Sequence, residues 1–319
     1  MPLLLCGSVN GSVITAIGLS VVLACPAAAA DPATAPRASS LPWSELSYGA
    51  RKFFLSASTT VRIEQVAASM IAGVLRTPPD GVAVPVPNGD VLIVATTSNL
   101  PFGRREETTV WLDANSSAAL QTAKLTTGGD PYVKTWRYTT AGFFMWRDSP
   151  RDATEARQGR EVWTDNRTQT ITTGASPPPG LAVTDPYALL VLIARARLDH
   201  SGEKATFAFI SEDRLAVATV IAGGLSVRHV DYRETWPGGA RRRQGEDLVR
   251  TVRVGAHMLG EATARQNVEL GFLGMRGSLT VFCEADTGLP VELQGTAPSV
   301  GVLTVRLTQA ALREPRRGS

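Results

Sequence analysis

The stretch TDPYALLVLIARARL, residues 184–198, decides the fold. A polar cap, Thr184 or Asp185, precedes Pro186, which suits the first position of a helix. From there the chain is apolar on almost every side, and a helix of that kind is normally buried on every side. The 13 residues of 186–198 would span roughly 20 Å, about the length of one strand in a curved sheet. The sequence therefore predicts one central helix enclosed by strands.

Strand patterns lie on both sides of this helix. Apolar and polar residues alternate with a period of two, which is typical of antiparallel strands with one buried face. The clearest examples are residues 57–64, 108–112, 132–138 and 303–308. We predict a mainly β fold, in which a strongly curved antiparallel sheet or incomplete barrel wraps around the buried helix at about 186–198.

Turn and connector signals separate these strands. Turns are predicted at residues 140–142, Gly223-Gly224, Gly238-Gly239 and 286–288. The segment SPPPG, residues 176–180, is typical of a stiff extended connector that leads into the helix.

Composition limits the class of protein. The chain has 319 residues, 44% of them hydrophobic, which is enough for a large core and excludes disorder. Its net charge of +3 is too small for nucleic-acid binding as a main role. No break in composition divides the body, so we predict a single β-rich domain over 41–312 and a basic tail over 313–319.

Residues 1–30 contain no charged side chain, which indicates an export segment. An apolar run from Val13 to Cys25 is followed by a proline and four alanines. Ala28 and Ala30 fit the small-x-small pattern of signal peptidase, which places cleavage between Ala30 and Asp31. We therefore expect a signal peptide over 1–30, a flexible leader over 31–40 and a periplasmic or secreted protein.

Two alternatives to cleaved export stay open. No Lys or Arg precedes the apolar run, although signal peptides normally begin with positive charge. A misassigned start codon would account for the missing charge. Otherwise residues 11–30 would serve as an uncleaved membrane anchor, or acylation of Cys25 would make the protein a lipoprotein.

Cysteine usage agrees with an exported body that has no internal disulfide. Cys6 and Cys25 leave with the signal peptide, so only Cys283 stays in the mature chain. Cys283 belongs to a predicted strand with an apolar face, and no nearby histidine is visible that would lower the pKa of its thiol. We therefore predict a buried core cysteine.

Searches for catalytic motifs return nothing specific. The sequence has no nucleophile elbow, zinc-protease motif, phosphate-binding loop or C-x-x-C pair. His200, His229 and His257 are scattered, so we expect no metal and no cofactor. Residues 201–204 match S-x-x-K but follow the helix, and 286–288 match a D-T-G loop once only. We interpret the first as a loop and the second as a hairpin turn with Gly288 at positive φ.

The carboxy-terminal hairpins resemble a known family. The segments Gly277–Val281, Asp286–Leu293 and Gly301–Leu307 are similar to those of the bacterial domain-of-unknown-function family 3108. Residues 184–186 resemble that family's helix opening, and residues 46–66 its first hairpin. The resemblance implies a small exported β-rich protein, and it supplies no catalytic residues.

These observations favour a non-catalytic role in the cell envelope over an enzyme. We expect the concave side of the sheet to bind an apolar or lipid-like ligand, or an envelope protein. Leu189, Leu190 and Ile193 on the helix, with Trp136 on a strand, are the candidate lining of a ligand cavity.

Three further hypotheses concern other residues. Arg241-Arg242-Arg243, at the tip of a predicted hairpin, are either solvated or in contact with anionic lipid headgroups at a membrane surface. A hydrolase acting on envelope material would need two paired carboxylates, with Glu106, Glu107 and Asp231 as candidates. A purely structural partner in an envelope complex would show a sizeable exposed apolar patch.

Overall fold

The computed structural model describes residues 41–52, 54–211, 213–259, 268, 270, 275–297 and 301–314. By its internal contacts the chain divides into two units, Met1–Ala33 and Thr34–Ser319, and all described residues belong to the second. The predicted signal peptide, its cleavage site at Ala30 and Asp31, the leader and Cys25 lie outside the described residues.

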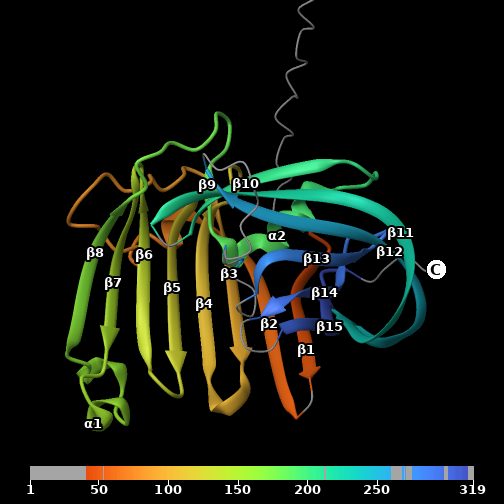
Figure 1. Ribbon diagram of the computed structural model, residues 1–319, viewed down its shortest axis with the longest axis horizontal. Coiled ribbons are helices and arrows are strands. Elements are labelled where there is room, and N and C mark those ends of the chain that lie inside the picture. The colour runs from red at the N-terminus through yellow and green to blue at the C-terminus, as the bar shows by residue number, and fades with distance from the viewer. Residues whose placement is uncertain are drawn as a thin grey trace, which may run out of the picture. The chain divides into compact units, whose positions relative to one another are not determined.

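Fifteen strands of the described chain form one sheet (Figure 1). The first eight follow one another as an antiparallel meander, each paired with the next along the chain. Their bounds are β1 (Trp43–Lys52), β2 (Leu55–Ala67), β3 (Asp90–Asn99), β4 (Arg105–Asp113), β5 (Ala119–Thr127), β6 (Tyr132–Thr139), β7 (Gly142–Ser149) and β8 (Asp165–Thr172). A short helix, α1 (Ala153–Ala156), stands between β7 and β8.

The remaining strands form a second series that joins the first through the pairing of β15 with β1. All neighbours in this series are antiparallel except β9 and β10, which are parallel. The bounds are β9 (Val183–Thr184), β10 (Lys204–Ser211), β11 (Arg214–Trp236), β12 (Gly239–Met258), β13 (Arg276–Glu284), β14 (Pro290–Ala297) and β15 (Gly301–Leu312).

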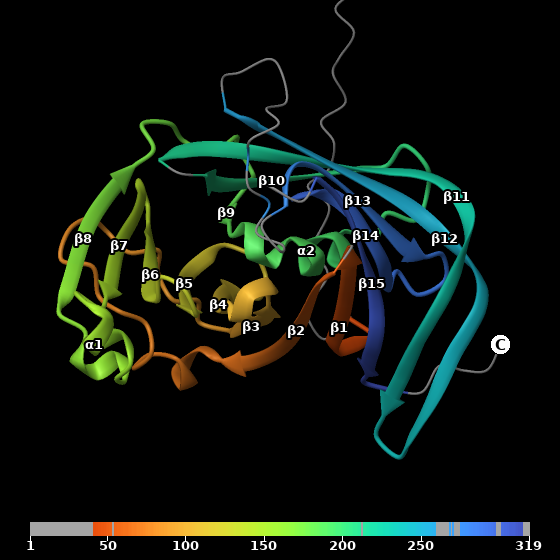
Figure 2. The same ribbon diagram turned by 60° about the horizontal axis from the view of Figure 1, so that its bottom comes forward.

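One further pairing closes part of the sheet into a ring. Residues 233–235 of β11 pair in parallel with residues 309–311 of β15, so β11 to β15 form a ring of five strands. The rest of the sheet curves around helix α2 (Leu189–Ala196) without closing (Figure 2). The predicted mainly β fold, a strongly curved sheet around one buried helix, is confirmed.

The central helix begins as predicted and ends earlier. Asp185 accepts a hydrogen bond from the Tyr187 amide, a 3₁₀ turn covers Pro186–Ala188, and α2 follows directly. The predicted end at residue 198 is wrong, because Arg197 adopts the left-handed conformation with a φ of 46°. One residue before the end, the buried Arg195 guanidinium donates to the Ala114 carbonyl at 2.6 Å and the Ser117 hydroxyl at 3.0 Å. These bonds tie the end of the helix to the β4–β5 connection.

The predicted turn at Gly223-Gly224 is also wrong, since both glycines lie inside the long strand β11. The register between β11 and β12 shifts between Ala222 and Leu225, which is the signature of a β-bulge. A bulge inserts extra residues into one strand and bends it. Here the glycines change the direction of β11 where the strand leaves β10 and runs toward the ring.

The expectation of one buried face fails for β3 to β5. Their outer face is buried as well, in a second apolar cluster that contains Ile71, Val91, Trp111 and Leu120. The segment between β2 and β3 covers this face. The buried Arg137 guanidinium bonds the Val84 carbonyl of that segment at 2.8 Å and also bonds the Leu120 carbonyl. Period-two alternation could not reveal a covering loop.

Several local predictions are confirmed. Cys283 is buried, and burial raises its thiol pKa to about 12, with a smaller contribution from the Glu284 carboxylate. Residues 286–288 form the turn between β13 and β14, with Gly288 at a φ of 66°. Residues 201–203 lie in the loop between α2 and β10 as predicted, whereas Lys204 is the first residue of β10.

Removal of one helix side chain tests the role of α2 in the core. Leu192 is 2% exposed and packs among residues of both halves of the sheet. We expect Leu192→Ala to lower the free energy of unfolding by about 2–5 kcal/mol, because it leaves a cavity. Val302→Ala, at a side chain that is 67% exposed, is the control and should change it by less than about 0.5 kcal/mol. Urea denaturation measures both, and equal effects would contradict central packing of the helix.

Candidate functional site

Two pockets lie at the two ends of α2. The helix-start pocket, of about 310 Å³, is lined by Trp136, and the helix-end pocket, of about 500 Å³, is lined by Ile193. Leu189 and Leu190 are only 4% and 3% exposed and line neither. The four residues predicted to surround one cavity are thus divided, because the helix itself fills the middle of the concave side.

The helix-start pocket is built from three parts of the fold. The inner face of β6 to β8 forms one wall, the beginning of the helix forms the floor, and β10 with the start of β13 forms the other wall. The lining residues are Lys134, Trp136, Tyr138, Phe143, Met145, Gln169, Ile171, Asp185, Pro186, Tyr187, Ile210, Ser211 and Arg276. The β6–β8 wall is mostly aromatic and aliphatic, with Lys134 as its charged side chain, whereas Asp185 and Arg276 belong to other parts of the lining.

Asp185 fixes the floor of the pocket. Its carboxylate accepts hydrogen bonds from the Tyr138 hydroxyl at 2.7 Å, the Thr122 hydroxyl at 2.5 Å and the Tyr187 amide at 2.8 Å. Burial raises the pKa of Asp185 above its usual value, although these hydrogen bonds oppose the rise. The pKa of Tyr138 is raised as well, mainly by burial and to a smaller extent by the negative charge of Asp185. The start of α2 is therefore locked onto β5 and β6.

Lys124 extends this network toward β4. Its ammonium lies 3.0 Å from the Tyr187 hydroxyl and 3.0 Å from a Glu106 carboxylate oxygen. Burial opposes its charge, but the Tyr187 hydroxyl and the Glu106 carboxylate outweigh burial and raise the pKa of Lys124. Lys124 therefore stays a cation on the inner face of the sheet.

Strand register places further cations beside Lys124. Lys124 lies directly opposite Lys134, Lys134 opposite Arg147, and Arg147 opposite Arg167. These four residues of β5 to β8 are termed the cationic row. The sequence analysis missed the row, because the four residues are far apart in the chain and only the register aligns them.

The helix-end pocket has a different character. Charged side chains of both signs line it, among them Arg197, Asp199, Arg250, Glu284 and Asp286. Its apolar contribution comes mainly from Ile193, Leu198 and Val252. The helix-start pocket suits an apolar ligand better, because aromatic and aliphatic side chains there form a continuous wall.

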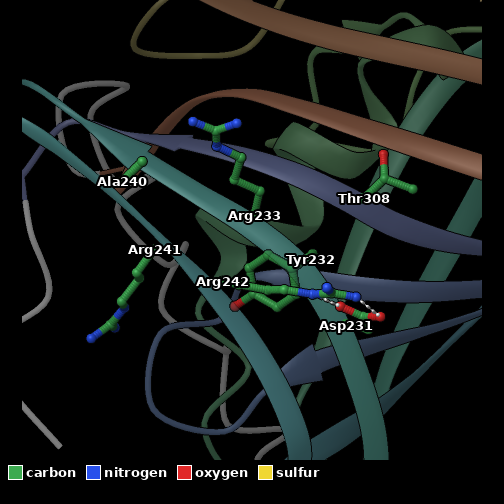
Figure 3. A pocket seen from close by; sticks show the side chains of 7 residues that line it. All are labelled: Asp231, Tyr232, Arg233, Ala240, Arg241, Arg242 and Thr308. Carbon is green, nitrogen blue, oxygen red and sulfur yellow. Dashed lines mark hydrogen bonds and ion pairs between the residues drawn. The ribbon is translucent and has the colours of Figure 1, made fainter.

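The arginine run was predicted at the tip of a hairpin, but it lies within strand β12, a few residues after the turn from β11. Each arginine has a carboxylate neighbour, listed here as Arg241 with Glu234, Arg242 with Asp231 and Arg243 with Asp247. In Figure 3 the side chains of Arg233, Arg241 and Arg242 point in different directions, and Arg242 is held by Asp231. Contact with anionic lipid stays a prediction, and the pairing reduces the charge available for it.

The candidate hydrolase carboxylates are all engaged with cations. Glu106 contacts Arg104 and Lys124, Glu107 contacts Arg105, and Asp231 contacts Arg242. Glu106 and Glu107 are successive residues of β4, so their side chains project from opposite faces of the sheet. These three residues do not form the paired carboxylates that the hypothesis required.

A different pair of carboxylates meets inside the five-stranded ring. The Tyr232 hydroxyl lies 2.5 Å from a Glu284 oxygen and 3.2 Å from a Glu234 oxygen. Both carboxylates are buried, at 1% and 0% exposure, and Glu234 is also paired with Arg241. This network ties β11 to β13 inside the ring, and Glu284 also lines the helix-end pocket. Among the described residues, no group of three His, Cys, Asp or Glu side chains could hold a metal ion.

An exposed apolar patch lies on the outer face of the β11–β12 hairpin. Leu225, Val227 and Leu248 are 50%, 58% and 46% exposed, and Val227 lies directly opposite Leu248.

Within the part of the chain that the structure describes, no helix is long and apolar enough to cross a membrane.

Comparisons with known proteins give little further guidance. No family model matches the chain, and no curated protein matches it. Among solved structures, the chain is similar to the β-barrel-like protein of domain of unknown function DUF1849 from Brucella abortus. The TM-score is 0.43 at 9% identity, and the match covers 85% of this chain and 97% of that chain. The resemblance to family 3108 stays a prediction.

The raised pKa of Asp185 gives a testable pH dependence. The folded protein binds this proton more tightly than the unfolded chain, so the stability from this group is full below the unfolded pKa, near 4, and is lost as pH rises through the folded value. As pH rises above about 4, stability should therefore shift in favour of Asp185→Asn over the wild type. Urea denaturation across this range measures the difference. Parallel curves would contradict the raised pKa, and Asp80→Asn, at an exposed residue, is the control.

Proposed function

We propose that the protein is a non-catalytic binding module that holds an apolar, lipid-like ligand in the helix-start pocket. The volume of about 310 Å³ is at the lower end of the range of pockets that take small molecules. Such pockets combine a mostly apolar lining with a few fixed polar groups. The helix-start pocket has this composition, with Asp185 and Tyr187 as the fixed groups.

The observation that carries this proposal is the apolar wall formed by cross-strand pairs. Trp136 lies directly opposite Met145, and Tyr138 lies opposite Phe143, with the last two rings 6.2 Å apart in an edge-on arrangement. These side chains belong to the inner face of β6 and β7. A ligand chain lying against them would remove aromatic and thioether surface from water, which is the main favourable term in binding apolar molecules.

The position of the helix supports this location. α2 packs against the middle of the sheet, and β6 to β8 extend beyond it on one side (Figure 2). Because the helix begins at the pocket floor, its packing holds the polar network there in place. The site therefore rests on rigid elements rather than on a loop.

A fluorescent fatty acid tests the proposal directly. We expect 11-dansylamino-undecanoate to bind, and Trp136→Ala to weaken its Kd about tenfold by removing the largest apolar contact. The matched control is Trp146→Ala, at a tryptophan of β7 that faces the other side of the sheet, against Phe144 and Arg76. Fluorescence titration measures both variants. Equal affinities for wild type and Trp136→Ala would overturn the proposed location.

We also propose that the protein is exported, so that it meets lipid-like ligands of the cell envelope. The support is the charge-free segment 1–30 and its small-x-small motif. Amino-terminal sequencing of the protein from its native cell should give Asp31 as the first residue. An intact Met1 would contradict cleavage, and an acylated Cys25 would identify a lipoprotein instead.

A further inference from the structure

We propose that the ligand of the helix-start pocket is an anionic amphiphile whose acidic headgroup is bound by the cationic row. This inference rests on the proposed function and specifies the chemical class of the ligand. It follows from how charge is distributed along the row and from where the row lies relative to the apolar wall.

The two ends of the cationic row are neutralised by carboxylates. Lys124 contacts Glu106 at 3.0 Å, and Arg167 contacts Asp165 at 3.0 Å. Asp165 is in turn held by the Ser149 hydroxyl at 3.0 Å. The charges at positions 124 and 167 are therefore balanced within the protein.

The two middle cations are not balanced in this way. Within the described part of the chain, neither Lys134 nor Arg147 forms an ion pair with a carboxylate within 4 Å, although the Asp165 carboxylate interacts with Arg147 at longer range. The Lys134 ammonium and the Arg147 guanidinium carbon each lie 5.1 Å from the centre of the Tyr132 ring. The Nε of Arg147 is buried and has no hydrogen-bond partner among the described residues. Like charges directly opposite each other on one face destabilise a sheet. The middle of the row therefore carries an excess of positive charge, and we expect the like-charge repulsion there to lower stability when no anion is present.

The middle of the row adjoins the apolar wall. Trp136 and Met145 lie two residues along the same strands from Lys134 and Arg147, on the same face and roughly 7 Å away. Lys134 itself lines the helix-start pocket, and Arg276, at the start of β13, lines its opposite wall. A molecule with its chain against Trp136 and Met145 would place its head among these three cations.

The chemistry of these groups selects a carboxylate or a phosphate. The planar guanidinium of Arg147 offers paired donors that match either oxyanion, and the Lys134 ammonium adds a compact charge. A neutral or cationic head would leave this charge uncompensated. A carboxylate and a phosphate headgroup both supply the negative charge that the site requires, and experiment decides which of the two is bound.

Four amphiphiles with the same dodecyl chain test the inference. These are dodecanoate, dodecyl phosphate, dodecyl maltoside and dodecyltrimethylammonium, each titrated below its micelle concentration by calorimetry with the full chain. We expect at least one of the two anions to bind ten times or more tighter than the neutral and cationic compounds. The comparison of dodecanoate with dodecyl phosphate shows which oxyanion is preferred.

Substitution of the middle cations should have opposite effects on two quantities, weakening the binding of the anion and raising the stability of the free protein. Lys134→Gln and Arg147→Gln should each weaken binding of the preferred anion about tenfold while leaving dodecyl maltoside unchanged. Both variants should also raise the Tm of the free protein, because they remove like-charge repulsion. Arg253→Gln, at an exposed arginine of β12, is the matched control and should change neither quantity.

The outcomes separate this inference from the proposed function. If all four compounds bind with equal affinity and Trp136→Ala weakens that binding, the proposal of an anionic headgroup is overturned, while the proposal of an apolar ligand in the helix-start pocket stands. Binding of none of the four would overturn both proposals. A lower Tm in the glutamine variants would show that the row is a structural element rather than a site held ready for an anion.

Discussion

The fold depends on the burial of a helix that is apolar on every side. Residues 189–193 are all buried, although α2 is only two turns long. A single flat sheet could cover only one side of such a helix, so the sheet has to curve around it. The antiparallel pairing of β1 with β15 makes this possible, because it joins an amino-terminal meander and a carboxy-terminal series into one continuous layer. The ring of β11 to β15 closes the carboxy-terminal side.

The same constraint decides where a ligand can lie. The helix occupies the middle of the concave side, so the remaining space is at its ends. At its beginning, Asp185 and Tyr187 fasten the helix to β5 and β6, and the inner face of β6 to β8 continues beyond it. Apolar pairs and then a row of cations follow one another on that face. Like charges lie opposite each other where the cations meet, which is the kind of local conflict expected at a functional site.

The sequence was sufficient for features set by local chemistry. The Asp185 cap, the apolar helix and the turn at Gly288 follow from residue type and spacing, and the strand alternation predicted a curved β fold. The bulge at Gly223-Gly224 was mistaken for a turn, because paired glycines are typical of both. Trp136 was recognised as a pocket residue, but Lys134 and Arg147 were not. Their alignment depends on strand register, which alternation alone does not specify.

A crystal structure of the protein with bound 12-bromododecanoate tests the central claim most directly, because anomalous scattering locates the bromine at the end of the chain. The account predicts a bromine position beside Phe143 and Met145 and a carboxylate between Lys134 and Arg147. Bromine in the helix-end pocket beside Ile193, or on the outer face of the sheet, would contradict it.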